Sequence, residues 1–266
     1  MNEKAILFLL VFIVVNVSGH ECWLQPDKFI YKRTEPINIK FLVGENFVGE
    51  NWNDDRDKIN CLQLYYANVV DKDLDANFGN ERGDSLQLAM IDDGTVMITL
   101  NTHNTFIDRG PQEFDQYLGA NHLTEALEYR KKSGDSARNG YENYQRCVKT
   151  ILQVGEKFTG ACNKKTDLPL DIVPLANPYN FGKDEFFKVK IYFMGEKLKK
   201  TKINIWHKLN DSVTQQEYMT NDEGEVKFSL SCDGEWMVTC VKMTRLKDDP
   251  KAEWQSYWSS LTWGYF

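Results

Sequence analysis

The sequence predicts a mainly β protein, built from two β-sandwich domains with a helical insertion in the first. Short runs rich in β-branched and aromatic residues recur along both halves of the chain, and turn-forming clusters separate them. One stretch between these runs changes to helical spacing. Aromatic content is high, with Trp 7, Tyr 12 and Phe 15, which favours strands and a packed core over disorder.

The N-terminus has the pattern of a secretory signal peptide. Lys4 supplies a positive charge, residues 5–15 form an apolar block, and Val17 and Gly19 occupy the −3 and −1 positions of a cleavage site. The block is shorter than the roughly 20 apolar residues that cross a membrane. We therefore expect cleavage after Gly19, an exported protein that is periplasmic or extracellular, and no membrane insertion of the mature chain.

The net charge limits the classes of partner that the protein is expected to bind. Cleavage removes Glu3 and Lys4 together, so the mature chain keeps the net charge of −7. Nucleic acid is a poor partner for such a chain because its phosphates require a basic face. Metal cations remain compatible with it. Removing 19 of the 266 residues leaves 247, enough for one large or two modest domains.

The first domain, residues 20–176, begins as strands. The sequence Asp92-Asp93-Gly94 predicts a tight hairpin between two of them. The runs expected to form strands are Phe29–Arg33, Ile37–Val43, Leu62–Val69, Leu86–Met90 and Thr95–Leu100.

A helical insertion is expected near residues 111–145. Pro111 suits the first turn of a helix, and Lys131 and Lys132 suit a helix C-terminus. The segment from Tyr141 onward is ambiguous, because its beginning has helical spacing whereas residues 148–154 also fit a buried strand.

The second domain is expected over residues 177–266. Pro169, Pro174 and Pro178 confine the segment before it to extended or edge positions. Regular strand runs with turns between them then predict a second sandwich. These runs are Phe186–Phe193, Ile203–His207, Gln216–Thr220, Glu225–Leu230, Glu235–Val241 and a final aromatic strand near the C-terminus.

Six cysteines lie in the exported part, and an even number in an oxidising compartment predicts disulfides. Sequence does not choose among the fifteen pairings, although Cys147 with Cys162 and Cys232 with Cys240 are close in sequence. The absence of a Cys-x-x-Cys pair disfavours a zinc ribbon or a thioredoxin-like site. The six are Cys22, Cys61, Cys147, Cys162, Cys232 and Cys240.

Several segments together resemble an exported bacterial family of unknown function that is similar to NikM-like periplasmic components of nickel and cobalt uptake. They are "HECWLQP", "FLVGENFVGENW", "YQRCVKTILQVG", "LPLDIVPLANPY" and "AEWQSYWSSLT". The resemblance spans the mature chain. It implies two immunoglobulin-like or transthyretin-like sandwiches, the second similar to a carboxypeptidase-regulatory module, and a histidine near the mature N-terminus that serves metal binding.

His20 would become that N-terminus. Its α-amine has a pKa of about 7.7–8.0 and its imidazole one of about 6.5, so both nitrogens are partly neutral near pH 7. Together they could chelate nickel, cobalt or copper. His103, at the exit of a predicted strand, is the first choice for a second ligand, and Glu21 is a weaker one. The alternative is that His20 simply begins an edge strand.

The function expected from the sequence is non-catalytic binding of a transition metal, for uptake or for delivery to a membrane transporter. The chain has no His-Glu-x-x-His, Gly-x-Ser-x-Gly or phosphate-binding glycine loop. One alternative is a structural or adhesive module whose C-terminal aromatics and Trp206 bind carbohydrate. A second is a copper enzyme that uses the N-terminal histidine for oxidation of polysaccharide.

Overall fold

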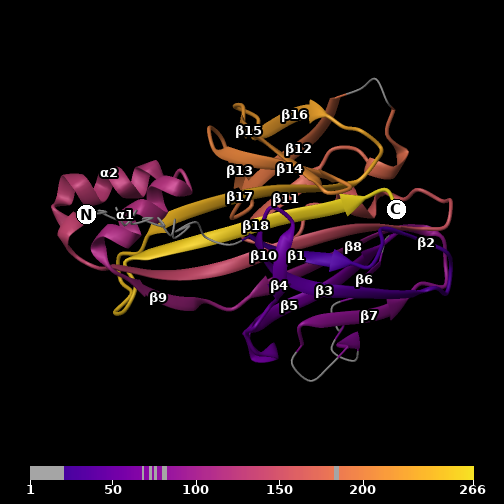
Figure 1. Cartoon of the computed structure of the whole chain (residues 1–266), viewed down its shortest axis with the longest axis horizontal. Helices are drawn as coiled ribbons and strands as arrows, with labels where there is room; N and C mark the ends of the chain where they lie inside the picture. Colours follow the sequence, from indigo (N-terminus) through magenta and orange to yellow (C-terminus); the bar gives the residue numbers. More distant parts are fainter. Residues whose placement is uncertain (1–20, 68, 72–73, 75–76, 80–82, 183–185) are drawn as a thin grey trace, which may run out of the picture.

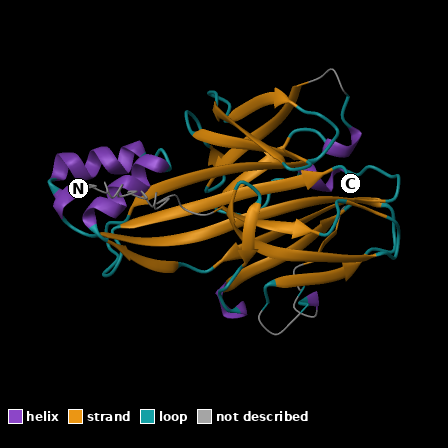
Figure 2. Ribbon diagram, viewed as in Figure 1, coloured by secondary structure: helices purple, strands orange, loops and turns teal. Residues whose placement is uncertain are grey.

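The computed structural model describes residues 21–266, apart from 68, 72–73, 75–76, 80–82 and 183–185. His20 and the signal sequence lie outside the described residues. Within the described part, strands dominate and two α-helices lie at one end (Figure 2). The first half contains β1 (Glu21–Pro26), β2 (Ile30–Tyr31), β3 (Pro36–Glu45), β4 (Val48–Asn51), β5 (Ile59–Tyr66), β6 (Val69–Asp71), β7 (Ser85–Ala89), β8 (Gly94–Thr102), β9 (Thr105–Arg109), α1 (Pro111–Ala120) and α2 (Thr124–Ser133). The second half contains β10 (Gly140–Val154), β11 (Leu170–Pro174), β12 (Phe186–Phe193), β13 (Glu196–Lys197), β14 (Lys202–Leu209), β15 (Ser212–Met219), β16 (Glu225–Ser229), β17 (Glu235–Arg245) and β18 (Trp254–Gly264).

The strands form three layers, so the predicted mainly β, sandwich-like fold class is confirmed. A ten-stranded central sheet has the order β15-β14-β17-β18-β10-β8-β5-β6, with β2 and β9 also paired to β10. The first outer sheet contains β1, β3, β4 and β7, and the second outer sheet contains β11, β12, β13 and β16. Figure 1 shows the first outer sheet in indigo and violet on one side of the central sheet and the second, in orange, on the other.

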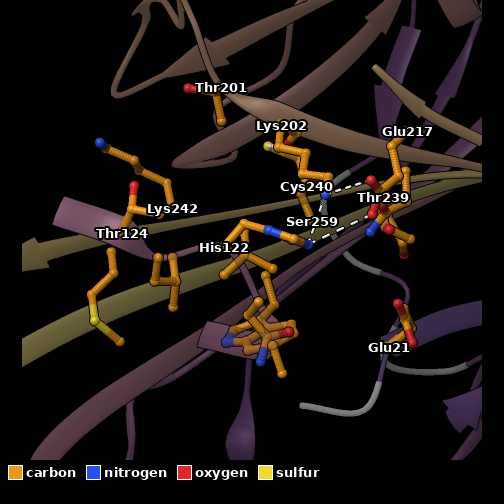
Figure 3. Close-up of a pocket in the computed structure, with 18 of the residues that line it drawn as sticks. Glu21, His122, Thr124, Thr201, Lys202, Glu217, Thr239, Cys240, Lys242 and Ser259 are labelled. Atoms are coloured by element: carbon orange, nitrogen blue, oxygen red, sulfur yellow. Dashed lines mark hydrogen bonds and ion pairs between the residues drawn. The ribbon is translucent and has the colours of Figure 1, made fainter. Parts of the chain in front are cut away.

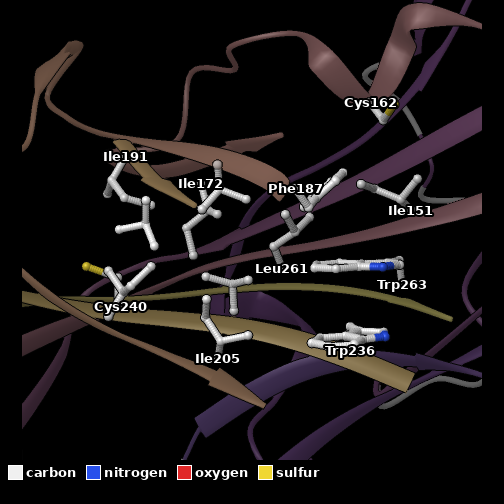
Figure 4. Packing of buried hydrophobic residues seen from close by; sticks show 14 of the residues in the cluster. Ile151, Cys162, Ile172, Phe187, Ile191, Ile205, Trp236, Cys240, Leu261 and Trp263 are labelled. Atoms are coloured by element: carbon white, nitrogen blue, oxygen red, sulfur yellow. The ribbon is translucent and has the colours of Figure 1, made fainter. Parts of the chain in front are cut away.

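Each outer sheet covers its own hydrophobic core. The core under the first outer sheet includes Phe41, Val96 and Leu152, all at most 1% exposed. The core under the second includes Phe187 and Trp263, which are fully buried with ring centroids 5.4 Å apart (Figure 4). Alternate residues of the central strands therefore serve two different cores, as the period of two in a strand requires.

Strand β10 is the longest strand of the central sheet. It pairs in parallel with β18, from Glu142 opposite Trp254 to Thr150 opposite Thr262, and its other edge pairs with β9 and then β8. The expected helical beginning of this segment is wrong: the α-helices end at Ser133, a 3₁₀ turn covers Asp135–Ala137, and the chain is extended from Gly140. Hydrogen-bonded partners on both edges outweigh the weak local preference for helix.

The helical insertion is confirmed over a shorter range than expected. Pro111 lies in the first turn of α1, and Lys131 and Lys132 lie in the last turn of α2. Helix α1 buries Phe114, Tyr117 and Leu118 against a small core that also contains Met243 and Trp254. The helices thus pack on the ends of β17 and β18 and not on either outer sheet.

Strands from both sides of residue 177 take part in the central sheet. Strand β11, which precedes that residue, pairs antiparallel with β12, which follows it, from Leu170 opposite Phe193 to Pro174 opposite Val189. The two halves of the chain therefore share sheets as well as cores. No helix in the described part of the chain is long and apolar enough to cross a membrane.

The expected disulfides are not formed, because all six cysteines, each in the described part, are free thiols. Cys240 lies five residues into β17 from Glu235, about 16 Å along the strand. Cys232 stays near the beginning of the strand, where Trp236 donates its indole N–H to the carbonyls of the flanking residues 231 and 233. A bridge needs Cα atoms within about 7 Å, so Cys232 and Cys240 are too far apart.

Candidate functional site

A pocket of 360 Å³ lies where the helical insertion, the central sheet and the beginning of β1 meet. The turn between α1 and α2 forms one wall, strands β14, β15, β17 and β18 form the floor, and Glu21 and Cys22 close one side (Figure 3). The pocket therefore brings together segments that are more than 100 residues apart in the sequence.

Strand periodicity determines which side chains reach the floor of the pocket. Lys202 lies opposite Met219, and Asn204 lies opposite both Glu217 on β15 and Thr239 on β17. Residues opposite one another on paired strands project from the same face of the sheet. These five residues all line the pocket, so this part of its floor is mostly polar.

An ionic network connects the floor to the helical wall. Nζ of Lys202 lies 2.6 Å from Oε2 of Glu217 and 2.7 Å from Nε2 of His122 (Figure 3). The ammonium has only donors, so it donates to Nε2, and the proton of a neutral His122 then resides on Nδ1. The hydrogen bond from Lys202 also lowers the pKa of Glu217. The network is partly exposed, so water screens it.

Glu21 lies apart from this network, at the side of the pocket where β1 begins (Figure 3). It pairs with Gly44 on β3. Burial is the main cause that raises the pKa of the Glu21 carboxyl to about 7; nearby Glu45 raises it further and Arg146 opposes the rise. The carboxyl is thus partly uncharged near neutral pH, and a bound cation would favour its ionised form.

The histidines lie in separate places. His103 is exposed in the turn between β8 and β9, donates its backbone N–H to the carbonyl of Lys58, and is not among the residues that line the pocket. His207 stacks on Trp236 with ring centroids 4.1 Å apart. His122 is exposed and also lines the pocket. Its partner Lys202 is 80 residues away, and no local pattern could have revealed that contact.

The described residues contain no group of three or more His, Cys, Asp or Glu side chains that could hold a metal ion. The pocket is lined by the Glu21 carboxyl and by two buried side-chain oxygens that have no hydrogen-bond partner among the described residues, Oδ1 of Asn204 and Oγ of Ser259. Nε2 of His122 is a further potential ligand atom, but it already accepts a hydrogen bond from Lys202. A metal in this pocket would therefore need further ligands from outside the described part.

Comparisons with known proteins give a family but no activity. The model of DUF4198, described as a domain of unknown function, matches residues 17–244. No curated protein matches the chain. A solved structure of a DUF3823 family protein from Bacteroides uniformis matches with 9% identity and a TM-score of 0.22, covering 92% of this chain and 99% of that one.

Proposed function

The chain belongs to the DUF4198 family, whose function is unknown, and we propose that it is an exported protein that binds a transition metal. The ion is nickel, cobalt or copper, and the protein acts without catalysis in uptake of the metal or in its delivery to a membrane transporter. The ligands are the amine and imidazole of His20 and the carboxylate of Glu21.

The observation that carries this proposal is the position of Glu21. This residue follows directly after the expected cleavage site and His20, and its carboxyl lines a 360 Å³ pocket. Its pKa is raised to about 7, mainly by burial. Ionisation of a buried carboxyl is costly when the group is alone. It becomes favourable beside a metal cation, because the cation compensates the buried negative charge.

The resemblance to NikM-like proteins supports the same site. A free N-terminal histidine offers two nitrogens that close a chelate ring, and both must be neutral to bind. Copper is favoured by intrinsic affinity. This chelate differs from the square site of some nickel and copper peptides, whose ligands are an amine, two amides and an imidazole. That site requires histidine in third place, and Cys22 occupies the third place here.

Three of the aromatic side chains on which the carbohydrate-binding alternative rests give it no support. Trp206, Trp254 and Trp263 are 6%, 4% and 0% exposed, so they are core residues without a face for a sugar ring. The copper-enzyme alternative shares the N-terminal histidine with our proposal and differs only in what the bound ion does.

The test is titration of the mature protein, beginning at His20, with nickel, cobalt, copper and zinc by calorimetry. A control protein carries one additional residue before His20, which converts the terminal amine into an amide. We expect tight one-to-one binding to the mature form and a loss of at least roughly tenfold in the extended form. His20→Ala should lose the binding altogether.

Equal affinity of the mature and extended forms, or undiminished binding to His20→Ala, would rule out the N-terminal site. If the copper-loaded protein consumes a reductant and oxygen while cleaving polysaccharide, the protein is the copper enzyme and the non-catalytic assignment is wrong. Absence of binding to either form would leave the structural or adhesive class.

A further inference from the structure

An amine and a carboxyl group meet in the core beneath the second outer sheet, and neither residue lines the pocket. Nζ of Lys149 on β10 contacts Oδ1 of Asp171 on β11. The side chains are 0% and 1% exposed, so bulk water does not reach them. The two strands belong to different sheets, and the contact therefore spans two layers of the fold.

The surroundings hold both groups in fixed orientations. Nζ of Lys149 donates to the carbonyl of Ile172 over 3.2 Å. Oδ2 of Asp171 accepts from the backbone N–H of Thr166 over 2.7 Å and from its hydroxyl over 3.1 Å. Oδ1, in contrast, is a buried atom with no hydrogen-bond partner in the described part beyond the contact with the amine. The two carboxyl oxygens thus have different environments.

Burial makes an ion pair costly at this position. Removing two charges from water costs several kcal/mol for each ion, and their attraction restores it only with excellent geometry. Burial lowers the pKa of Lys149, although Asp171 opposes this effect. Transfer of one proton from the ammonium to the carboxylate gives a neutral amine beside a neutral carboxylic acid, which is the pair that condenses.

We propose that Lys149 and Asp171 form an intramolecular amide bond, a covalent cross-link between the central sheet and the second outer sheet. The reaction is a condensation that needs no oxidant or cofactor. Well-oriented groups within one molecule react as if their effective concentration were about 10⁵ M or more. The dry core also excludes the water that would favour hydrolysis back to the separate groups.

The neutral Nζ of Lys149 attacks Cγ of Asp171, and the electron pair of the carbonyl moves onto Oδ2. The N–H and hydroxyl of Thr166 stabilise this oxyanion, in the manner of an oxyanion hole. The nitrogen passes one proton to the protonated Oδ1, which leaves as water, and the carbonyl at Oδ2 forms again. Of the three ammonium protons, two depart with the water and one stays on the amide.

The amide product keeps the hydrogen bonds that the two separate side chains make. The remaining amide N–H continues to donate to the carbonyl of Ile172, and Oδ2 keeps both donors from Thr166. The atom that leaves is Oδ1, whose one partner in the described part is Nζ of Lys149. Neighbouring thiols do not compete as nucleophiles, because burial raises the pKa of Cys147 and Cys162 to about 12 and keeps both protonated.

The test is mass spectrometry of the full-length protein after reduction and alkylation, which removes any effect of disulfides. The cross-linked form weighs less than the unmodified chain by the mass of one water. Trypsin should then release a branched peptide that joins residues 147–157 to 166–183, because the acylated Lys149 resists cleavage. Recovery of the separate peptides 147–149 and 166–183 in full yield would overturn the proposal and leave an ion pair.

Two variants test the assignment of roles. Lys149→Arg keeps a cation that can pair with Asp171 but cannot condense under these conditions, and it should show no loss of water. Thr166→Val removes one donor to Oδ2 and keeps the backbone N–H. It should cross-link on the order of 10²-fold more slowly, so freshly purified protein should contain both forms. An unchanged rate in Thr166→Val would remove the role that we assign to its hydroxyl.

Discussion

Tyr117 on α1 donates its hydroxyl hydrogen to Oε1 of Glu142 on β10 over 2.9 Å, with both residues buried. Ser256 on β18 donates to the same oxygen, whereas Oε2 of Glu142 has no hydrogen-bond partner among the residues that the structure describes. One carboxyl group therefore joins the helical insertion to the two long strands beside it, and only one of its two oxygens receives donors from the described part.

This arrangement predicts a stability that falls with pH. Burial raises the pKa of Glu142 in the folded protein above the ordinary value of 4.5 for a glutamate, although the hydrogen bonds from Ser256 and Tyr117 oppose the rise. At pH values between the pKa of Glu142 in the unfolded protein and its higher pKa in the folded protein, the native state binds more protons than the unfolded state. The free energy of unfolding is therefore highest below the unfolded pKa and decreases as the pH rises through this window.

Glu142→Gln should remove that decrease while keeping the acceptor at Oε1. Denaturant unfolding of both proteins between pH 4 and pH 8 measures the effect. As the pH rises, the free energy of unfolding of the variant should increase relative to that of the wild type, by up to roughly 1.4 kcal/mol for each pH unit between the two pKa values. A constant difference across this range would show that Glu142 does not cause the pH dependence.

Gly140 provides a test of how the insertion packs. A Cβ at this position would lie 2.1 Å from the ring of Phe114, which is fully buried. Gly140→Ala should therefore displace α1 and cost about 1–3 kcal/mol of the free energy of unfolding. Gly119→Ala in α1 itself is the control: its Cβ meets nothing within 4 Å, and it should gain about 0.5–1 kcal/mol. Equal effects would contradict this packing.

The thiols should differ in reactivity. Cys232 is exposed, whereas Cys147, Cys162 and Cys240 are buried with pKa values raised by burial to about 12. In the native protein we expect rapid alkylation at Cys232 and none at the three buried thiols, because the thiolate is the reactive form. Unfolding without a reductant should make all six thiols available. A smaller number after unfolding would reveal a disulfide.

Glu21→Gln should weaken metal binding by roughly tenfold or more, because an amide oxygen replaces a carboxylate ligand. Glu125→Gln is the matched control: Glu125 also lines the pocket, but it is 83% exposed and pairs with Lys242. Calorimetric titration of both variants compares the same chemical change at two places on the rim. Equal losses would indicate a general electrostatic effect and would contradict direct ligation by Glu21.

His103 was the second ligand predicted from the sequence. It lies outside the pocket lining, in the turn between β8 and β9, so we expect His103→Ala to bind metal as tightly as the wild type. His122→Ala, which removes a pocket histidine, serves as the comparison. Lost affinity in His103→Ala alone would restore the sequence-based assignment and exclude the pocket as the place of the second ligand.

Much of the fold could be predicted from local patterns. Alternation and turn signals located most strands, and β12 agrees with its expected range, Phe186–Phe193. The beginning of β10 could not be predicted, because Tyr144 is held extended by partners at Thr105 and Ser256 that lie far away in sequence. Residue spacing within one segment carries no information about such partners.

The pocket could not be predicted from the sequence for the same reason. Glu21 could be predicted as a site residue because it follows the expected cleavage site and His20. Asn204 and Glu217 share a face only because β14 and β15 pair in one particular register. His122 reaches them because the helical insertion folds back over the sheet. Each of these relationships depends on tertiary structure, which a single sequence does not display.

The parallel pairing of β10 with β18 also constrains when the protein can fold. The central sheet closes only when residues 254–262 reach residues 142–150, and the hydroxyl of Thr262 donates to the carbonyl of Leu24 on β1. Strands β1 and β18 thus depend on each other. Such distant contacts make folding slow, and the central sheet cannot close until residues 254–262 have been synthesised. If the protein is exported as we propose, a translocation channel would receive a chain whose central sheet is still open.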